Sequence, residues 1–511
     1  MHVETVSSPT NIACIKYWGK ADKKFNTPIN SSVSVTLDQD DLRSITSVAA
    51  SKSFIADRLW LNGTELQMDD LNKNPHANRF LTCMKEMRKL ACDRIDPKTG
   101  EVTIKASEWD QYHVHVVSKN TFPTAAGLAS SAAGYACLVF ALANLFNVPI
   151  DEKGLSELSV IARQGSGSAC RSLFGGFVKW QMGSSKTEWK DSRAIPVASR
   201  DSWPELETLI LVANDAKKDT SSTDGMDQSV KTSPLLAFRA REVVDDRLAR
   251  IEKAFKEKDF ATFGDLAMAD SNQFHATCLD TLPPIFYLND TSRQIIRLVH
   301  AFNKFHGKVV AAYTFDAGPN AVIFVPKEHH KLLTAFMLHF FPVCTRPADF
   351  SNRPDLIQAA SQVKSSQFDE LIKAGAATGR VPKPGDVKMM YCTRIGDGPR
   401  ILKDPTDCLI NEQGYPKPDI EKKKDKSQTD SQAEEDSIAP VDKTVEEVKQ
   451  LRLKVESLQQ AIGTQNQLIS RLLSFSDIGF TFIKVAMLGK ALKFAWKCGW
   501  IFPNVVSPCK K

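Results

Sequence analysis

The chain has 511 residues, of which 42% are hydrophobic and 25% charged, and it contains 25 Gly and 25 Pro. This globular composition excludes collagen-like, mucin-like and wholly disordered chains. The net charge of +6 lies in residues 478–511, which hold six Lys and no acidic residue, so the body is balanced and is not expected to bind nucleic acid.

Cysteine usage and the first residues bear on localisation. The eleven Cys are scattered and form no C-x-x-C pair, which is typical of reduced thiols in the cytoplasm and disfavours structural zinc. Residues 1–5 have neither the basic nor the apolar region of a signal peptide. No run of 18 uncharged apolar residues predicts a membrane span. We therefore expect a cytoplasmic protein.

Residues 1 to about 420 mix short strand-like runs with helical patterns, which predicts an α+β body rather than a doubly wound sheet. The turn-rich stretch 182–203 suits a connection between two domains. The clearest strand-like runs are 31–37, 113–117, 208–213 and 321–325, and the clearest helical patterns are 132–146 and 245–256.

The first polar segment, residues 11–20, places Lys16 and Lys20 beside Tyr17 and Trp18, ahead of a turn. Aromatic residues ordinarily belong to the core, but lysines next to them at a turn could instead meet an anionic ligand. Both interpretations remain open for this segment.

A loop of small residues, 123–134, leads directly into an apolar helical pattern. The free N–H groups at a helix start attract phosphate, and Gly127 permits close approach of an anion. The loop lacks G-K-[ST] and is therefore not a Walker A loop. The alternative is that these small residues only cap a tightly packed helix.

Three later segments offer related chemistry. Residues 165–172 add the Arg171 guanidinium, which can hold a carboxylate or phosphate through two hydrogen bonds. Residues 217–223 supply two Lys and four hydroxyls. Asp316 lies in a tight turn, where Asp is commonly a turn-former, but in a phosphate-rich cleft it would meet a substrate hydroxyl. Together these segments predict a substrate with several phosphates.

The tail differs from the body. Residues 421–440 are charged and polar, which predicts a disordered linker. Apolar residues at a/d spacing, with Gln465 at one d position, predict a coiled coil over 441–474; a single helix lying on the body is the alternative. Residues 475–511 are apolar but interrupted by Lys. They suit an amphipathic helix at a membrane surface, a membrane anchor whose lysines snorkel to the head groups, or a structural helix that buries its apolar face on the body.

Four segments together resemble the diphosphomevalonate decarboxylase family of the GHMP kinase superfamily: YWGK at 17–20, PTAAGLASSAAG at 123–134, SGSACRS at 166–172 and TFDAGPN at 314–320. The resemblance runs from residue 3 to about 420. It implies a two-domain α+β GHMP-kinase-like fold, with an ATP-binding domain at 1–195, a second domain at 196–420 and the active-site cleft between them.

The resemblance also implies an activity and its partners. The expected reaction is ATP-dependent decarboxylation of 5-diphosphomevalonate to isopentenyl diphosphate, with ATP and Mg²⁺ bound in the cleft and a homodimer as the usual assembly. The tail has no counterpart in the family. It leaves open a membrane-surface or coiled-coil partner through residues 441–511.

Individual residues take roles by the same resemblance. Asp316 would act on the C3 hydroxyl and Arg171 on the substrate carboxylate, with Asn11 and Lys20 completing the catalytic set. The implied substrate-binding residues are Tyr17, Trp18, Gly19, Lys20, Arg79, Ser166, Gly167, Ser168, Ala169, Cys170, Arg171, Ser222 and Thr223. The implied ATP-binding residues are Gly127, Leu128, Ala129, Ser130 and Ser131, and no residue is assigned as a metal ligand.

Two other functions compete with this one. The first is a GHMP small-molecule kinase that transfers phosphate without decarboxylation, for which CO₂ release is the discriminator. The second is a non-catalytic tethering or assembly protein that acts through its tail. The presence of the acid, the arginine and the loop residues speaks against an idle site.

Overall fold

A computed structural model describes residues 1–421 except 69–74, 97, 123–129, 185–188 and 215–218. The predicted linker, coiled coil and basic tail, like Gly127, Leu128 and Ala129, lie outside the described residues. Residues Met1–Lys423 form one compact unit. No helix among the described residues is long and apolar enough to cross a membrane.

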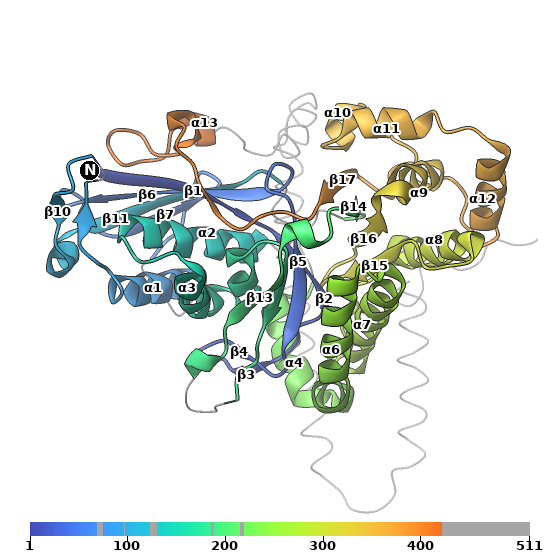
Figure 1. The fold of residues 1–511 in the computed structure, drawn as a ribbon, viewed down its shortest axis with the longest axis horizontal. Helices are drawn as coiled ribbons and strands as arrows, with labels where there is room; N and C mark the ends of the chain where they lie inside the picture. The colour runs from blue at the N-terminus through green and yellow to red at the C-terminus, as the bar shows by residue number, and fades with distance from the viewer. Residues whose placement is uncertain (69–74, 97, 123–129, 185–188, 215–218, 422–511) are drawn as a thin grey trace, which may run out of the picture. The chain divides into compact units, whose positions relative to one another are not determined.

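The N-terminal half is built on a six-stranded sheet in the order β18-β1-β6-β11-β7-β8. Helix α2 (Ser130–Leu145) packs against β1 and β6, and α1 and α3 pack beside it (Figure 1). Because α2 is apolar on all sides, it is buried between the sheet and the other two helices. The remaining bounds are β1 (His2–Pro9), β6 (Arg43–Ser51), β7 (Arg58–Leu61), β8 (Thr64–Glu65), α1 (Pro75–Arg88), β11 (His113–Asn120), α3 (Glu152–Gly165) and β18 (Arg400–Ile401).

A second sheet, in the order β13-β12-β5-β2, carries the segments that reach the cleft. Its strands are β2 (Asn11–Ile15), β5 (Ser32–Thr36), β12 (Phe177–Trp180) and β13 (Ala194–Ala198). The short helix η2 (Gly167–Leu173) joins α3 to this sheet. Three hairpin or terminal elements complete this half: β3 (Lys20–Asp22) with β4 (Thr27–Pro28), β9 (Arg94–Ile95) with β10 (Val102–Ile104), and α13 (Pro418–Glu421).

The C-terminal half has a four-stranded antiparallel sheet, β15-β16-β14-β17, that is buried on both faces. Leu209 and Leu211 of β14 pack with α8 and α9, whereas Ile210 and Val212 pack with α6 and α7. This alternation follows the two-residue period of a strand. The strands are β14 (Leu206–Val212), β15 (Ala312–Phe315), β16 (Ala321–Pro326) and β17 (Met389–Arg394).

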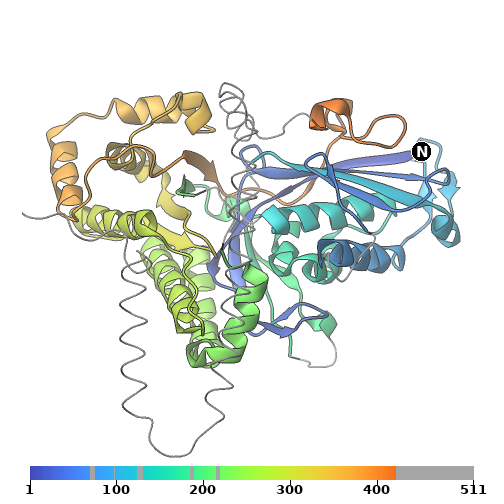
Figure 2. The same cartoon turned by 180° about the vertical axis from the view of Figure 1, so that it is seen from behind.

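Helices cover both faces of this third sheet (Figures 1 and 2). The helices of this half are α4 (Ser222–Thr232), α5 (Pro234–Phe238), α6 (Val244–Glu257), α7 (Phe260–Asp280), α8 (Asp290–His306), α9 (Lys327–Phe340), α10 (Pro347–Phe350), α11 (Pro354–Ser361) and α12 (Ser366–Ala376). A π-helical turn, η5 (Arg239–Val243), connects α5 to α6.

One hydrophobic core spans both halves. It contains Ile12 and Val35 of the second sheet together with Ile210 of the third sheet and Phe263 of α7. This shared core fixes strand β2 of the first half against α7 of the second. The predicted boundary between residues 195 and 196 stays a prediction, since residues of both sides contribute to this core.

The predicted mixture of helices and strands is confirmed. The runs 31–37, 113–117, 208–213 and 321–325 form β5, β11, β14 and β16, and the patterns 132–146 and 245–256 form α2 and α6. The stretch 182–203 is less simple than a connection, because it contains β13, an edge strand that accommodates Pro196. The nine described Cys form no disulfide.

Candidate active site

A cavity of about 500 Å³ opens where the second sheet, α1, α2 and η2 meet α4 and the turn after β15. Among the described residues that line it are four cationic side chains and a single carboxylate, that of Asp316. The cations are Lys16, Lys20, Arg79 and Arg171. Such an excess of positive charge in a concave, partly desolvated site favours a ligand with several negative charges.

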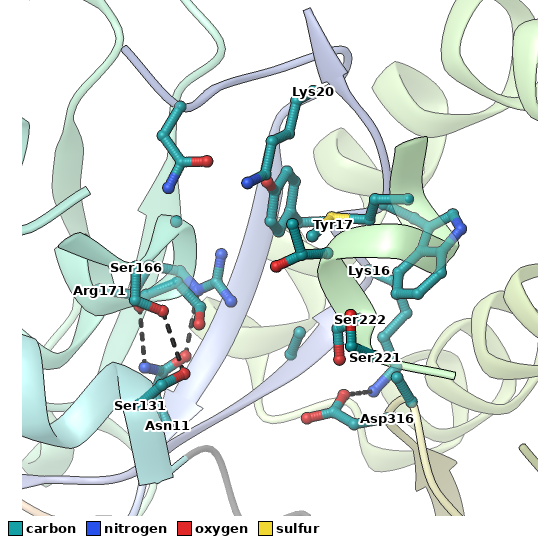
Figure 3. A pocket seen from close by; sticks show the side chains of 18 of the residues that line it. Asn11, Lys16, Tyr17, Lys20, Ser131, Ser166, Arg171, Ser221, Ser222 and Asp316 are labelled. Carbon is teal, nitrogen blue, oxygen red and sulfur yellow. Dashed lines mark hydrogen bonds and ion pairs between the residues drawn. The ribbon is translucent and has the colours of Figure 1, made fainter. Parts of the chain in front are cut away.

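The carboxylate and one of these cations form an ion pair (Figure 3). Lys16 Nζ lies 2.6 Å from Asp316 Oδ1. The lysine side chain is 3% exposed, but the aspartate side chain is 35% exposed and faces the cavity. The buried ammonium therefore holds one carboxylate oxygen, while the side chain remains accessible to a ligand.

The two partners of this pair are 300 residues apart in sequence. Lys16 follows the last residue of β2, and Asp316 follows the last residue of β15. The Gly318 N–H donates to the Asp316 carbonyl over 2.7 Å, which closes a tight turn at this position. The strand ends of the two halves thus deliver opposite charges to the same point.

Arg171 lies on the opposite side of the cavity and is 2% exposed. Its Nε donates to Ser34 Oγ at 2.9 Å and to Asn11 Oδ1 at 3.2 Å, and its Nη1 donates to Ser32 Oγ at 2.6 Å. Within the described part of the chain, Nη2 makes no hydrogen bond. Since the side chain also lines the cavity, this nitrogen is available to an anionic ligand.

Asn11 fixes this arrangement from β2. Its Nδ2 donates to the Ser172 hydroxyl at 2.7 Å and to the Ser168 carbonyl at 3.1 Å, while its Oδ1 accepts from Arg171. Burial lowers the pKa of Arg171 from its usual value, although a guanidinium remains charged at neutral pH. The amide of Asn11 therefore orients a permanent cation.

Small hydroxyl residues line the end of the cavity where α2 begins. Ser131 Oγ lies 3.2 Å from Ser166 Oγ, and both residues line the cavity with Ser130. The first turn of α2 presents backbone N–H groups at the positive end of the helix dipole, which favours phosphate. This end of the cavity can therefore hold phosphate groups.

A second cationic group borders the start of α4. Arg79 Nη2 donates to Thr223 Oγ1 at 3.3 Å, and Lys20 lies nearby on β3. Burial, together with the charges of Arg79 and Lys23, lowers the pKa of Lys20 to about 8. An anion bound here would stabilise the charged form of Lys20 and raise its pKa again.

An apolar wall completes the cavity. Trp18, Met226, Phe274 and Ala317 line it and belong to one small buried cluster. The Trp18 indole N–H donates to Ser229 Oγ at 2.9 Å, which satisfies the single polar group of the ring. Gly19 adopts φ +95°, which allows the turn between Trp18 and β3.

Most of the residues expected from sequence converge here. Gly19, Ala169 and Cys170 are not among the lining residues, and Ala169 and Cys170 are fully buried residues of η2 itself. Burial raises the pKa of the Cys170 thiol to about 12, so this cysteine stays protonated. The expected residues that line the cavity are Asn11, Tyr17, Trp18, Lys20, Arg79, Ser130, Ser131, Ser166, Gly167, Ser168, Arg171, Ser222, Thr223 and Asp316.

The sequence singles out Lys16 as a contact for an anionic ligand, whereas the structure pairs it with Asp316. Sequence reasoning missed several other lining residues. Asn26 and Met226 carry no motif that would single them out. Phe274 lies in the segment 271–285, which also resembles the family, but nothing in that segment marks it as a lining residue. Ser221 lies in the polar run 217–223, but that run did not distinguish it from its neighbours.

Two family models match the body of the chain. Residues 8–194 match the diphosphomevalonate decarboxylase-like N-terminal domain, and residues 208–402 match the mevalonate 5-diphosphate decarboxylase C-terminal domain. The diphosphomevalonate decarboxylase of Ganoderma lucidum is 49% identical over 420 residues, which are 81% of this chain and 98% of that protein. The corresponding protein of Bos taurus is 48% identical over 81% of this chain and 98% of its own.

Solved structures give the same result. A crystal structure of mevalonate 5-diphosphate decarboxylase superposes with a TM-score of 0.67 at 43% identity, over 81% of this chain and all of that one. The mevalonate diphosphate decarboxylase of Trypanosoma brucei gives 0.69 at 36% identity, over 80% of this chain and all of its own. The structure of MDDEF in complex with MVAPP, AMPPCP and magnesium gives a TM-score of 0.58 at 28% identity, over 79% of this chain and 99% of its own.

The lowered pKa of Lys20 predicts how anion binding depends on pH. The ammonium loses its proton as the pH rises through about 8, so the affinity for inorganic pyrophosphate should fall between pH 7 and 9, by roughly tenfold if only the charged form binds. Isothermal titration calorimetry measures this. Lys20→Met should weaken binding at pH 7 and flatten the dependence.

Lys253→Met is the matched control, since Lys253 is 72% exposed, pairs with Glu257 and does not line the cavity. It should keep the dependence seen in the unmodified protein. A Lys20→Met variant with an unchanged pH dependence would contradict the assignment.

Proposed function

The chain belongs to the diphosphomevalonate decarboxylase family and is an ATP-dependent decarboxylase of 5-diphosphomevalonate; we propose that the cavity described above is its active site. The observation that carries the proposal is the Lys16–Asp316 pair at the centre of a cationic cavity. A carboxylate held beside a substrate hydroxyl can accept its proton, and the surrounding cations match a substrate with a carboxylate and a diphosphate.

The substrate lies, in this proposal, between Asp316 and Arg171. The Arg171 guanidinium binds the substrate carboxylate through Nη2, because Nε and Nη1 are already engaged by Asn11, Ser32 and Ser34. Lys20 and Arg79 bind the diphosphate. The apolar wall formed by Trp18, Met226, Phe274 and Ala317 accommodates the hydrocarbon part of the substrate.

ATP is the second substrate, and the start of α2 is its phosphate-binding end. Ser130 and Ser131 lie there, and both resemble family positions that contact ATP. Mg²⁺ fits a site made largely of phosphate oxygens with these hydroxyls, since the described residues contain no cluster of three or more His, Cys, Asp or Glu. When bound, the ion neutralises phosphate charge during transfer.

The chemistry proceeds in two stages. Asp316 accepts or orients the proton of the C3 hydroxyl while that oxygen takes the γ-phosphoryl group, and ADP leaves. The C–O bond to the new tertiary phosphate then breaks, which develops positive charge at C3. Loss of CO₂ supplies the electron pair of the new C=C bond, so the products are isopentenyl diphosphate, phosphate and CO₂.

Lys16 has a specific part in the first stage. Its ammonium, which is 2.6 Å from Oδ1, fixes the orientation of Asp316. A fixed carboxylate avoids the cost of reorganisation at the moment of proton transfer. On the other side of the cavity, Asn11 likewise fixes the orientation of Arg171 before the substrate binds.

The organisation of the chain extends this proposal. We place the boundary between an ATP-binding domain at 1–195 and a second domain at 196–420, which the matched ranges 8–194 and 208–402 support. A homodimer is proposed from the family resemblance, and a coiled-coil or membrane-surface partner from the pattern of residues 441–511.

Light scattering on the full-length protein tests the assembly, with and without phosphatidylserine-containing vesicles. We expect the mass of a dimer or a larger coiled-coil assembly, and co-sedimentation with the vesicles if the basic tail binds anionic lipid. A protein that is monomeric and does not bind the vesicles would contradict both the coiled-coil and the membrane-surface proposals.

Product analysis tests the reaction. Full-length protein with ATP, Mg²⁺ and carboxyl-labelled 5-diphosphomevalonate should release ADP and labelled CO₂ in equal amounts. ADP without CO₂ would identify a kinase, and the absence of both products from folded protein would contradict the proposal.

Asp316→Asn is the informative variant in the same assay, because it keeps the shape of the side chain but cannot accept the proton. We expect turnover to fall by a factor of about 10² to 10⁴ with KM for the substrate nearly unchanged. Asp245→Asn is the control, because Asp245 is an exposed residue of α6 outside the cavity lining. Near-native turnover in Asp316→Asn would contradict the role of Asp316.

A further inference from the structure

Helix α7 contacts the backbone beside both partners of the Lys16–Asp316 pair. The helix packs along β15 and against β2, the two strands from which Asp316 and Lys16 extend (Figure 1). Two consecutive residues of α7, Asp270 and Ser271, make the contacts. Both are buried, at 0% and 1% exposure, and neither lines the cavity.

Asp270 holds Lys16. The Lys16 N–H donates to Asp270 Oδ2 at 2.7 Å, and the Lys16 carbonyl accepts from Arg239 Nη2 at 3.1 Å. Arg239 in turn binds both oxygens of Asp270, at 2.7 and 2.8 Å. The Asp270–Arg239 ion pair therefore holds both backbone groups of Lys16, the N–H and the carbonyl.

The Asp270–Arg239 ion pair is anchored within the second half of the protein. Arg239 opens the π-helical turn η5, a local distortion that is frequent at functional sites, and is 0% exposed. Arg247 Nη1 adds a second contact to Asp270 at 2.8 Å. Although burial opposes ionisation, the charge of Arg239 and its hydrogen bonds keep the pKa of Asp270 below its usual value.

Ser271 holds the other partner. The Phe315 N–H, which directly precedes Asp316, donates to Ser271 Oγ at 2.9 Å. Strand β15 is at the edge of its sheet, so outward-facing N–H groups need acceptors from outside the sheet. Asn272 supports the same strand, since its Oδ1 accepts from the Tyr313 hydroxyl at 3.1 Å.

We propose that the Asp270–Ser271 turn of α7 is a positioning element that sets Lys16 and Asp316 in register for proton transfer. This inference rests on the proposed function. It assigns Asp270 and Ser271 to the same reaction, although neither contacts the substrate. A single rigid helix turn then fixes the separation of the charged partners, which come from strands 300 residues apart.

Ser271 offers the clean test. Removal of Asp270 would leave Arg239 buried without its counter-ion and destabilise the whole fold. Ser271→Ala removes a single hydroxyl, which is the acceptor for the Phe315 N–H. Thr277→Val is the matched control: Thr277 is a fully buried residue of the same helix whose hydroxyl donates only to the Gln273 carbonyl, at 3.0 Å.

Steady-state kinetics and thermal unfolding are measured on the full chain for both variants and for the unmodified protein. Both variants should lose some thermal stability, but Ser271→Ala alone should lower kcat, by roughly tenfold or more, with KM for both substrates nearly unchanged. Equal effects of the two variants on kcat, or a fully active Ser271→Ala, would overturn the inference.

The parent protein is assayed alongside, which separates this inference from the proposed function. An unmodified protein that releases no CO₂ would contradict the function itself. An active parent with an unaffected Ser271→Ala variant would contradict only the positioning role.

Discussion

The 2.6 Å contact between Lys16 and Asp316 is the constraint on which the rest of the site depends. A nearly buried ammonium needs a counter-ion, and the protein provides it from the opposite half of the body. To bring the two together, β2 and β15 must end at the same place. The shared hydrophobic core and the contacts from α7 hold these strand ends there.

A second constraint is the concentration of positive charge around this pair. Lys20, Arg79 and Arg171 line the same cavity, and the Arg171 side chain is held by Asn11 and by two serines of β5. Their mutual repulsion is relieved when polyanionic substrates bind. The same fixed charges favour phosphoryl transfer, which depends mainly on positioning and on the stabilisation of charge.

Sequence reasoning could predict what is local. The strands β14 and β16 are short continuous apolar runs, α2 is a long apolar stretch, and α6 has clear helical periodicity. Asp316 and Arg171 lie in segments that resemble the family. It could not predict that Lys16 pairs with Asp316, because the two residues are 300 positions apart and only the tertiary fold brings them together. Asp270 and Arg239 show the same limit, since their buried pair joins helices through tertiary packing alone. Strand β13 was hidden in a turn-rich stretch because it is short and lies at a sheet edge.

The central claim is that the C3 hydroxyl oxygen, activated beside Asp316, becomes the phosphoryl acceptor before CO₂ is lost. The most direct test follows the fate of that oxygen in 5-diphosphomevalonate labelled with ¹⁸O at the C3 hydroxyl. The account predicts that each molecule of CO₂ is accompanied by one molecule of inorganic phosphate carrying the ¹⁸O, detected by mass spectrometry. Unlabelled phosphate, with the ¹⁸O released into water, would contradict it.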